Sequence, residues 1–261
     1  MLPGTTMEHQ STETPSPSLP KINTIELSDP LQWLVSGWND FKETGFRAAL
    51  YGLLFALMGY LIVWMYATRW QLTMGLISGF FLMGPFVCTG IYYLSRQLHQ
   101  AEPVSLPASL TCWRNNPGAI GFFAVILTFT MIVWARVSLI LFALFSTTSF
   151  PTLSGVLQVI FSTQNMPFLL VWLAVGFVFA SLVFAISVVA VPMMLDRDTD
   201  TMTAVFTSAR TLYTNPLPLY LWALLVVAII GISLLLGFVP LIITAPLIGH
   251  ATWHAYRALV D

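Results

Sequence analysis

Long stretches without a charged residue are the feature that most constrains how this chain can fold. Runs of 21 and 26 uncharged residues separate Arg47, Arg69 and Arg96, and a run of 59 separates Arg136 from Asp196. A helix needs about 20 apolar residues to cross the hydrocarbon core of a bilayer. Charged residues make up only 8% of the 261 residues, whereas a soluble domain carries about 25%. The pattern predicts a polytopic membrane protein, and it excludes a soluble enzyme, a disordered regulator and a nucleic-acid binder.

The apolar runs indicate helices rather than barrel strands, because they are continuous instead of alternating with polar residues. We predict an all-α polytopic membrane bundle with six transmembrane helices, at residues 47–67, 72–94, 117–145, 167–195, 217–237 and 240–257. With the N-terminus inside, only Arg69 among the loop cations lies outside, and eight lie inside: Lys21, Lys42, Arg47, Arg96, Arg114, Arg197, Arg210 and Arg257. The positive-inside rule then predicts that both termini are cytoplasmic.

A polar tail and three similar units make up the predicted organisation. Residues 1–28 hold no apolar signal-peptide core, so we expect a disordered cytoplasmic tail. Residues 29–261 form the six-helix membrane domain, with repeat-like units at 29–96, 105–197 and 199–257. In each unit an amphipathic cytoplasmic helix precedes a hairpin, and the second hairpin helix carries a proline that would bend it: Pro85, Pro192 and Pro246. The alternative is that the three prolines are unrelated. Pro85 and Pro246 each lie 11 residues before an arginine, but Pro192 of the middle unit does not.

The helices that precede the hairpins are predicted from apolar stripes at helical spacing. In the first, Asp29 can cap the helix and Pro30 suits its first position. The apolar stripe of this first helix predicts that it lies on the inner leaflet, and the stripe consists of Leu31, Leu34, Val35, Trp38 and Phe41. The stripe of the third such helix predicts the same position, and it consists of Met202, Val205, Phe206, Ala209, Leu212 and Tyr213. The uncharged outer loop, residues 146–167, predicts a short interfacial or re-entrant helix.

Several segments together resemble an uncharacterised family of bacterial predicted integral membrane proteins, a domain of unknown function. The segments that carry the resemblance are Gly37 to Phe41, Tyr51 to Phe55, Gly84 to Arg96, Trp134 to Arg136, Ser187 to Arg197, Asn215-Pro216 and Gly249 to Arg257. The resemblance implies a six-helix protein of the bacterial inner membrane with no assigned activity. Four histidines are too few for a haem–copper centre, and we expect no cofactor.

Arg136 is the one cation that the sequence places within a membrane span. It lies about 28 Å along a helix that begins at Pro117, at about 1.5 Å per residue. No Asp or Glu lies inside any predicted span to pair with it. Arg136 could contact an anion or a lipid headgroup, or line a translocation path. The alternative is an arginine whose long side chain reaches the interface or bonds free carbonyls.

A second candidate cluster lies at the cytoplasmic ends of the last helices. His250 and His254 share one helix face, and Asp196, Asp198 and Asp200 lie at the same membrane level. Two histidines and a carboxylate could bind a transition metal or relay protons. The alternative, which we favour, is an interfacial polar belt without a metal, in which Trp253, Tyr256 and Arg257 also take part. Asp196 and Arg197 would pair with Arg96 or each other. Asp200 or Thr201 can cap the helix that follows.

Three functions remain open on this evidence. We favour a non-enzymatic structural or assembly component that contacts the lipid bilayer and another membrane protein or a second copy of itself, with no nucleic acid. The absence of acidic residues within the predicted spans motivates this choice. The first alternative is a small transporter or channel for an anionic or lipidic solute that uses Arg136, as internal repeats and broken helices are common in transporters. A membrane enzyme that uses His250, His254 and Asp196 is the third possibility.

Overall fold

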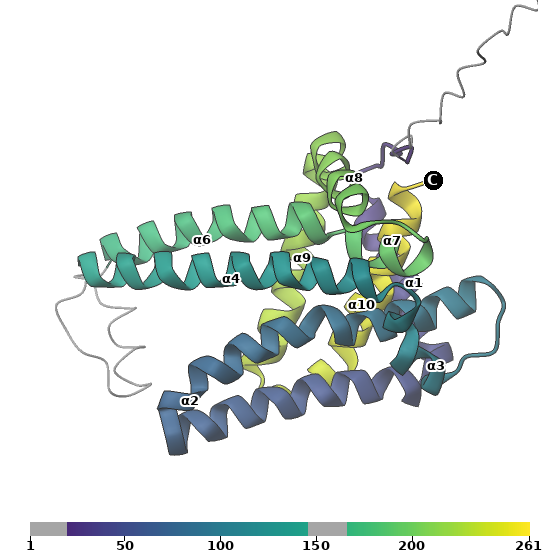
Figure 1. The fold of residues 1–261 in the computed structure, drawn as a ribbon. Coiled ribbons are helices and arrows are strands. Elements are labelled where there is room, and N and C mark those ends of the chain that lie inside the picture. Colours follow the sequence, from purple (N-terminus) through teal and green to yellow (C-terminus); the bar gives the residue numbers. More distant parts are fainter. Residues whose placement is uncertain (1–19, 146–165) are drawn as a thin grey trace, which may run out of the picture.

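The protein is an all-helical bundle in a computed structural model that describes residues 20–145 and 166–261, except the side chains of residue 66 and residues 69–86 (Figure 1). The described helices are α1 (Asp29–Thr44), α2 (Phe46–His99), α3 (Leu106–Thr111), η1 (Cys112–Asn115), α4 (Pro117–Phe145), α6 (Met166–Ser187), α7 (Ala190–Asp196), α8 (Thr201–Thr214), α9 (Pro216–Leu235) and α10 (Leu241–Leu259). The strand-like pairing in the described residues is a single bridge between Ile22 and Val260.

Four described segments are long and apolar enough to cross a membrane: Phe46–Met65, Pro117–Phe145, Met166–Asp196 and Pro216–Leu235. They coincide with the predicted first, third, fourth and fifth spans. The predicted second span falls on the part of α2 whose side chains are largely outside the description. The predicted sixth span falls on α10, which is helical over 19 residues but is not among the four.

Helix α2 forms two arms that return alongside each other (Figure 1). Ala48, Tyr51 and Phe55 of the first arm share a buried cluster with Ile91 and Leu94 of the second. Gly90 lies directly against the Tyr51 ring, so a larger residue at position 90 would collide with that ring. The two predicted spans of the first unit are therefore packed against each other.

Helix α10 is packed against α1 and the first arm of α2 through glycines. A Cβ atom at Gly37 of α1 would lie 2.6 Å from the backbone nitrogen of Ala251, closer than such atoms pack. Gly52 of α2 packs against the backbone of Ile242, the residue four positions before Pro246 in α10. Proline has no N–H to donate to that carbonyl, so the backbone of Ile242 is free for a close approach. The two glycines thus let the three helices meet at backbone distance.

The apolar stripe of α1 is only partly buried. Leu31, Val35 and Trp38 of the predicted stripe are exposed, whereas Trp33, Gly37 and Thr44 are buried against the bundle. Helix α8 shows a similar arrangement: its buried residues are Thr201, Ala204, Thr207, Ser208 and Thr211, and Met202, Phe206 and Tyr213 are exposed. Part of each stripe, including Leu34 and Leu212, packs against the core, and the rest faces outward, as in a helix on the surface of a bilayer.

The predicted cap of α1 is wrong in detail. The residue at the N-cap position is Ser28, which makes no capping hydrogen bond, and Asp29 is the first helical residue. The Asp29 carboxylate instead accepts a hydrogen bond from the backbone N–H of Glu26. Pro30 lies in the first turn, as predicted, where its missing N–H has no helical partner in any case.

Helices α4 and α6 run side by side and extend beyond the turn of α2 (Figure 1). Their contact is aromatic: the Trp134 ring lies 5.6 Å from the Trp172 ring and 5.3 Å from the Phe179 ring. The fourth predicted span is divided, because α6 ends at Ser187 and α7 begins at Ala190. Ser208 of α8 holds this break, since its hydroxyl donates to the carbonyl of Ala185 and accepts from the N–H of Val189.

Residues 20–28, the last part of the predicted tail, are bonded to the bundle. The backbone N–H of Asn23 donates to the carbonyl of Leu259, and the Asn23 side chain donates to the carbonyl of Ala258. Asn215 accepts from the N–H of Ile25 and donates to the carbonyl of Asn23. Residues 20–28 are thus bound to the C-terminus and to α9, because this segment offers backbone groups that the neighbouring helix ends can satisfy. Residues 1–19 and the predicted helix of the outer loop, up to residue 165, lie outside the described residues.

Candidate functional site: a polar layer and an apolar pocket

Asp40 is the centre of the first of two polar clusters near the ends of α1, α2 and α10. Its carboxylate accepts from the Ser95 hydroxyl at 2.6 Å and lies 2.9 Å from Nε2 of His254. The Ser95 hydroxyl oxygen is also 2.6 Å from Nδ1 of His250, whose Nε2 is 3.2 Å from the Thr44 hydroxyl. These five residues, the Asp40 cluster, connect the partly exposed His254 to His250, which has 0% of its surface exposed.

The hydrogen bonds of the Asp40 cluster define which nitrogen of His250 carries a proton. The single proton of the Ser95 hydroxyl is committed to the Asp40 carboxylate, which can only accept when ionised. Nδ1 of His250 must therefore be the N–H that donates to the Ser95 oxygen. Nε2 of a neutral ring is then an acceptor that faces the Thr44 hydroxyl, whose single proton also has the backbone carbonyl of Asp40 within 2.8 Å. The imidazole thus joins three helices through two hydroxyl groups.

Asp196 is the centre of the second cluster, which binds the end of α7 to α2 and α10. Its carboxylate lies 3.2 Å from Nε of Arg96 and 3.5 Å from Nη1 of Arg257, and it accepts from the Tyr256 hydroxyl at 2.9 Å. Arg197 donates to the same hydroxyl and to the carbonyls of the last two residues. We call Asp196, Arg96, Arg197, Tyr256 and Arg257 the Asp196 cluster, and the two clusters together the polar layer.

The structure brings together most of the predicted polar residues but with different partners. His250 and His254 share a helix face as predicted, yet the carboxylate beside them is Asp40 and not the Asp196 group. The predicted pair of Arg96 with Asp196 is present. Among the described residues, no group of three or more His, Cys, Asp or Glu side chains could hold a metal ion. Two histidines and one carboxylate here bond to hydroxyls and to each other instead.

Asp200 serves the predicted role at the start of α8. Its carboxylate accepts from the backbone N–H of Thr203 at 3.0 Å, which satisfies one of the free donors of the first turn. Hydrogen bonds from the side chain and backbone of Thr203 hold the pKa of the Asp200 carboxyl below its usual value. Asp198, in contrast, is exposed. Of the three acidic residues at the end of α7 and after it, Asp196 therefore contacts the bundle, Asp198 is solvated and Asp200 caps α8.

Three residues of the polar layer were not among the predicted candidates: Asp40, Thr44 and Ser95. Asp40 lies off the apolar stripe of α1, and amphipathic reasoning assigned it to water. The signal that could have found it is the line of Gly37, Asp40 and Thr44 at helical spacing, since small and polar residues mark the packed face of membrane helices. Ser95 precedes Arg96 directly and lies one helical turn after the buried Ile91.

Arg136 lies on the exposed ridge of α4 that also carries Val125, Phe129 and Ile132. The opposite side of α4 lines the cavities described below, with Leu127 and Met131. Arg136 does not line these cavities. Within the described residues its guanidinium has no hydrogen-bond or ion-pair partner. The structure therefore separates Arg136 from the polar layer and turns it toward the surroundings of the bundle.

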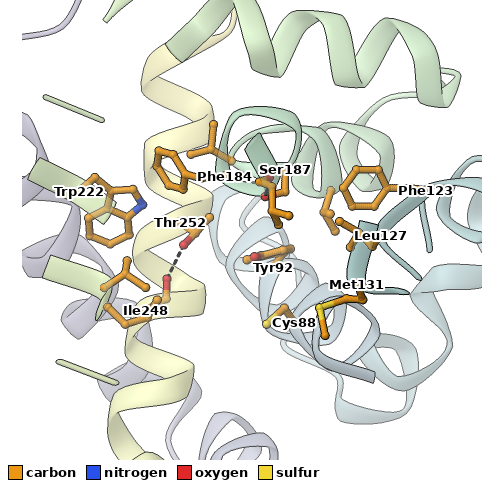
Figure 2. Close-up of a pocket in the computed structure, with 14 residues that line it drawn as sticks. Cys88, Tyr92, Phe123, Leu127, Met131, Phe184, Ser187, Trp222, Ile248 and Thr252 are labelled. Carbon is orange, nitrogen blue, oxygen red and sulfur yellow. Dashed lines mark hydrogen bonds between the residues drawn. The ribbon is translucent and has the colours of Figure 1, made fainter. Parts of the chain in front are cut away.

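An apolar pocket of about 340 Å³ lies at the junction of five helices (Figure 2). Its lining comes from α2, α4, α6, α9 and α10, with Val188 and Val191 near the break between α6 and α7. Figure 2 shows Tyr92 reaching into it between Thr252 of α10 and Leu127 of α4. No lining residue is charged, and its hydroxyls belong to Tyr92, Ser187 and Thr252. We call this the central pocket, and its volume lies in the range of small-ligand sites.

Two larger grooves continue from the central pocket along α6. The α4/α6 groove of about 740 Å³ shares Met131 and Val183 with it. The α6/α9 groove of about 970 Å³ shares four wall residues with it: Val183, Phe184, Ser187 and Val226. Phe177 and Leu224 on the walls of the second groove are exposed, so this groove opens on the apolar surface of the bundle. The central pocket is thus continuous with the surface that lipid would cover.

One comparison with known proteins gives a match. A family model described as a predicted integral membrane protein (DUF2189) matches residues 72–196, from the second arm of α2 to the end of α7. The matched region contains α4, α6 and α7 and two members of the Asp196 cluster. The expected resemblance to an uncharacterised family of predicted integral membrane proteins is confirmed over this region. No curated protein and no solved structure matches the chain.

Proposed function

We propose that this chain is a non-enzymatic assembly component of a bacterial inner membrane. The premise is that residues 72–196 match a family of predicted integral membrane proteins. In this proposal six helices span the membrane, namely the two arms of α2, α4, α6, α9 and α10, and both termini are cytoplasmic. The α4/α6 hairpin associates with another membrane protein or with a second copy of the chain. The function is thus to hold a partner within the bilayer.

One observation carries the proposal: none of the 22 residues of α6 is buried. Leu170, Ala174, Val178 and Leu182 are exposed at four-residue spacing, on the side of the helix opposite the grooves. Such a ridge fits the groove between residues of a neighbouring helix. The small Ala174 at its centre would let a partner backbone approach closely, as small residues do in membrane helix pairs. We call these four residues the α6 ridge.

The polar layer supports a structural role rather than catalysis. Asp196 binds two guanidinium groups and a phenol, and both ring nitrogens of His250 face hydroxyl groups. A general base or a nucleophile needs a substrate within reach of the proton that moves. These groups instead contact one another across α1, α2, α7 and α10. Their arrangement keeps one end of the bundle rigid while α4 and α6 extend from it.

The proposed orientation follows from the same end of the molecule. Figure 1 shows α1, α3, α7, α8 and the C-terminus together at one end, where the cations of the polar layer also lie. The positive-inside rule favours this end as the cytoplasmic one. Arg136, about 28 Å along α4 from Pro117, then comes near the outer boundary of a hydrocarbon core about 30 Å thick. That depth suits an arginine that contacts headgroups or an acidic partner residue.

A transporter that uses Arg136 has less support. A solute path needs its charged residue on the wall of a cavity, and Arg136 lies on the face of α4 opposite the central pocket and the α4/α6 groove. The continuous grooves along α6 are apolar, which does not suit an anionic solute. The assembly role explains the exposed α6 ridge, which the transport role leaves without a purpose.

Site-specific photo-cross-linking in native membranes tests the proposal. A photoreactive amino acid at Val178, which is 64% exposed on the α6 ridge, should give a discrete cross-linked product that mass spectrometry identifies as this chain or another membrane protein. The matched control is Leu57 of α2, which is 56% exposed on a different side of the bundle and should give no such product. Equal labelling at both positions, or no protein product at Val178, would contradict the proposal.

A further inference from the structure

The central pocket has features that exceed what the packing of a bundle requires. Its walls come from five helices, yet their side chains leave about 340 Å³ unfilled beside a cluster of three hydroxyl groups. Membrane helices gain stability from close packing, because lipid offers no stronger hydrophobic drive between them. A gap of this size, bordered by polar atoms, is costly unless something occupies it. The side chains of the walls define which class of ligand the pocket can bind.

The hydroxyl groups of the pocket present acceptors to an incoming molecule. The Thr252 hydroxyl donates its proton to the carbonyl of Ile248 at 2.7 Å, and the Ser187 hydroxyl donates to the carbonyl of Val183 at 2.6 Å. The Tyr92 hydroxyl lies beside the side chains of Thr252 and Cys88. The protons of the Ser187 and Thr252 hydroxyls are therefore committed within the protein, and lone pairs of these two oxygens remain. A ligand that matches these walls must bring its own donor.

Charge and access narrow the ligand further. No charged residue lines the pocket, so a charged head would be buried there without a counter-ion. Toward the polar layer, Arg96 and Tyr256 each lie four residues, about 6 Å of helix, beyond Tyr92 and Thr252, and neither lines the pocket. On the other side the α6/α9 groove connects the pocket to the apolar surface. A ligand therefore enters from the bilayer and not from water.

We propose that the central pocket binds a neutral membrane-soluble molecule that has one hydroxyl donor on an apolar chain. The hydroxyl donates to the oxygen of Ser187, and the chain extends between α6 and α9 along the groove that shares Val183 and Val226 with the pocket. Such chemistry occurs in free long-chain alcohols and in diacylglycerol of the membrane. The site is separate from the α6 ridge, so the inference does not depend on the proposed assembly function.

Photolabelling of the whole protein in lipid nanodiscs tests the ligand class. The probe is a sixteen-carbon alcohol that carries a diazirine in its chain, and the comparison probe is its methyl ether, which has no donor. The alcohol should label peptides of the pocket wall, such as that of Val226, about fivefold more than the ether, the effect of one hydrogen bond. Equal labelling by both probes would overturn the assignment of a hydroxyl ligand.

Two matched variants locate the site, and a third measures the hydrogen bond. Val183→Phe fills the pocket and should lower labelling by the alcohol about fivefold or more. Val178→Phe adds the same volume on the outer side of α6 and should leave labelling unchanged. Ser187→Ala, which adds no bulk, should reduce the preference for the alcohol over the ether. Unchanged labelling in a folded Val183→Phe variant would overturn the proposal. If that variant fails to fold, an unchanged preference for the alcohol in Ser187→Ala would overturn it instead.

A photoreactive diacylglycerol distinguishes the two sources of the hydroxyl. Labelling of the pocket wall by this lipid, lost in Val183→Phe, would support a membrane lipid as the occupant. Labelling by the alcohol alone would support a free long-chain alcohol. Labelling of the exposed faces of α4 and α9 at the same level as the pocket wall, by either probe, would show bulk lipid contact only and would overturn the proposal.

Discussion

Gly52→Ala perturbs the contact on which the packing of α2 against α10 depends. A Cβ atom at position 52 would lie 2.6 Å from the carbonyl carbon of Ile242, whereas ordinary contact begins at 3.4 Å. The obstacle is backbone and cannot rotate away. Because Pro246 follows four residues later, the Ile242 carbonyl is the one that lacks its helical N–H, and Gly52 fills the space beside it.

The expected loss of stability follows from two opposing effects. The two helices must separate by about 1 Å to relieve the collision, and over-packing of this kind costs about 1–3 kcal/mol. Replacing a helical glycine by alanine contributes up to about 1 kcal/mol in the stabilising direction. The control Gly231→Ala in α9 isolates the second effect, because a Cβ atom there meets nothing within 4 Å. Because the helix-propensity gain is common to both variants, we expect them to differ by the over-packing cost, about 1–3 kcal/mol in the free energy of unfolding.

Reversible unfolding in mixed detergent micelles measures this difference. Titration with a denaturing detergent, followed by tryptophan fluorescence and circular dichroism, gives the free energy of unfolding for the wild type and both variants. Gly52→Ala should unfold at a clearly lower detergent fraction than the wild type, and Gly231→Ala at the same or a higher one. Equal stability of Gly52→Ala and Gly231→Ala would refute the claim that α2 and α10 meet at backbone distance.

The remaining predictions concern single charged residues. Asp40→Ala removes the shared acceptor of the Asp40 cluster and should lower the free energy of unfolding by about 1–3 kcal/mol in the same titration. Asp196→Asn should destabilise the protein more than Asp198→Asn, whose exposed side chain is the control; equal effects would contradict the role of the Asp196 cluster. Asp200→Ala should cost about 0.5–2 kcal/mol at pH 7. Because the pKa of Asp200 is lowered in the fold, that difference should shrink as the pH falls below the ordinary aspartate pKa and disappear once the folded carboxyl is protonated. Arg136→Leu should leave stability in micelles unchanged and reduce recovery of a partner from membranes; a large loss of stability would reveal an internal contact.

The membrane helices were predictable because a single physical rule places them. A helix in lipid must be apolar over nearly its whole length, so the apolar run that Arg136 alone interrupts predicted α4 over 117–145 with the bounds that the structure shows. The break between α6 and α7 was not predictable in the same way. It depends on Ser208, which lies in another helix and contacts the carbonyl of Ala185 only in the folded bundle.

The polar layer was predicted only in part, for a related reason. His250, Arg96 and Asp196 stood out because polar residues are rare near membrane spans. Asp40 did not stand out, because polar residues of an amphipathic helix normally face water. In α1 Leu31, Val35 and Trp38 are exposed while Gly37, Asp40 and Thr44 face α10, so the assignment of Asp40 to water is reversed. The sequence pattern defines the two faces of such a helix, and the neighbours decide which one is buried.

The mass of the protein extracted from native membranes with its surrounding lipid tests the central claim most directly. Native mass spectrometry of polymer-extracted particles should find the chain in a complex larger than its own 29.0 kDa. Ala174→Trp, which fills the centre of the α6 ridge, should release the single chain, and Leu57→Trp on α2 should not. A wild-type protein that is recovered only as a single chain would contradict the assembly role.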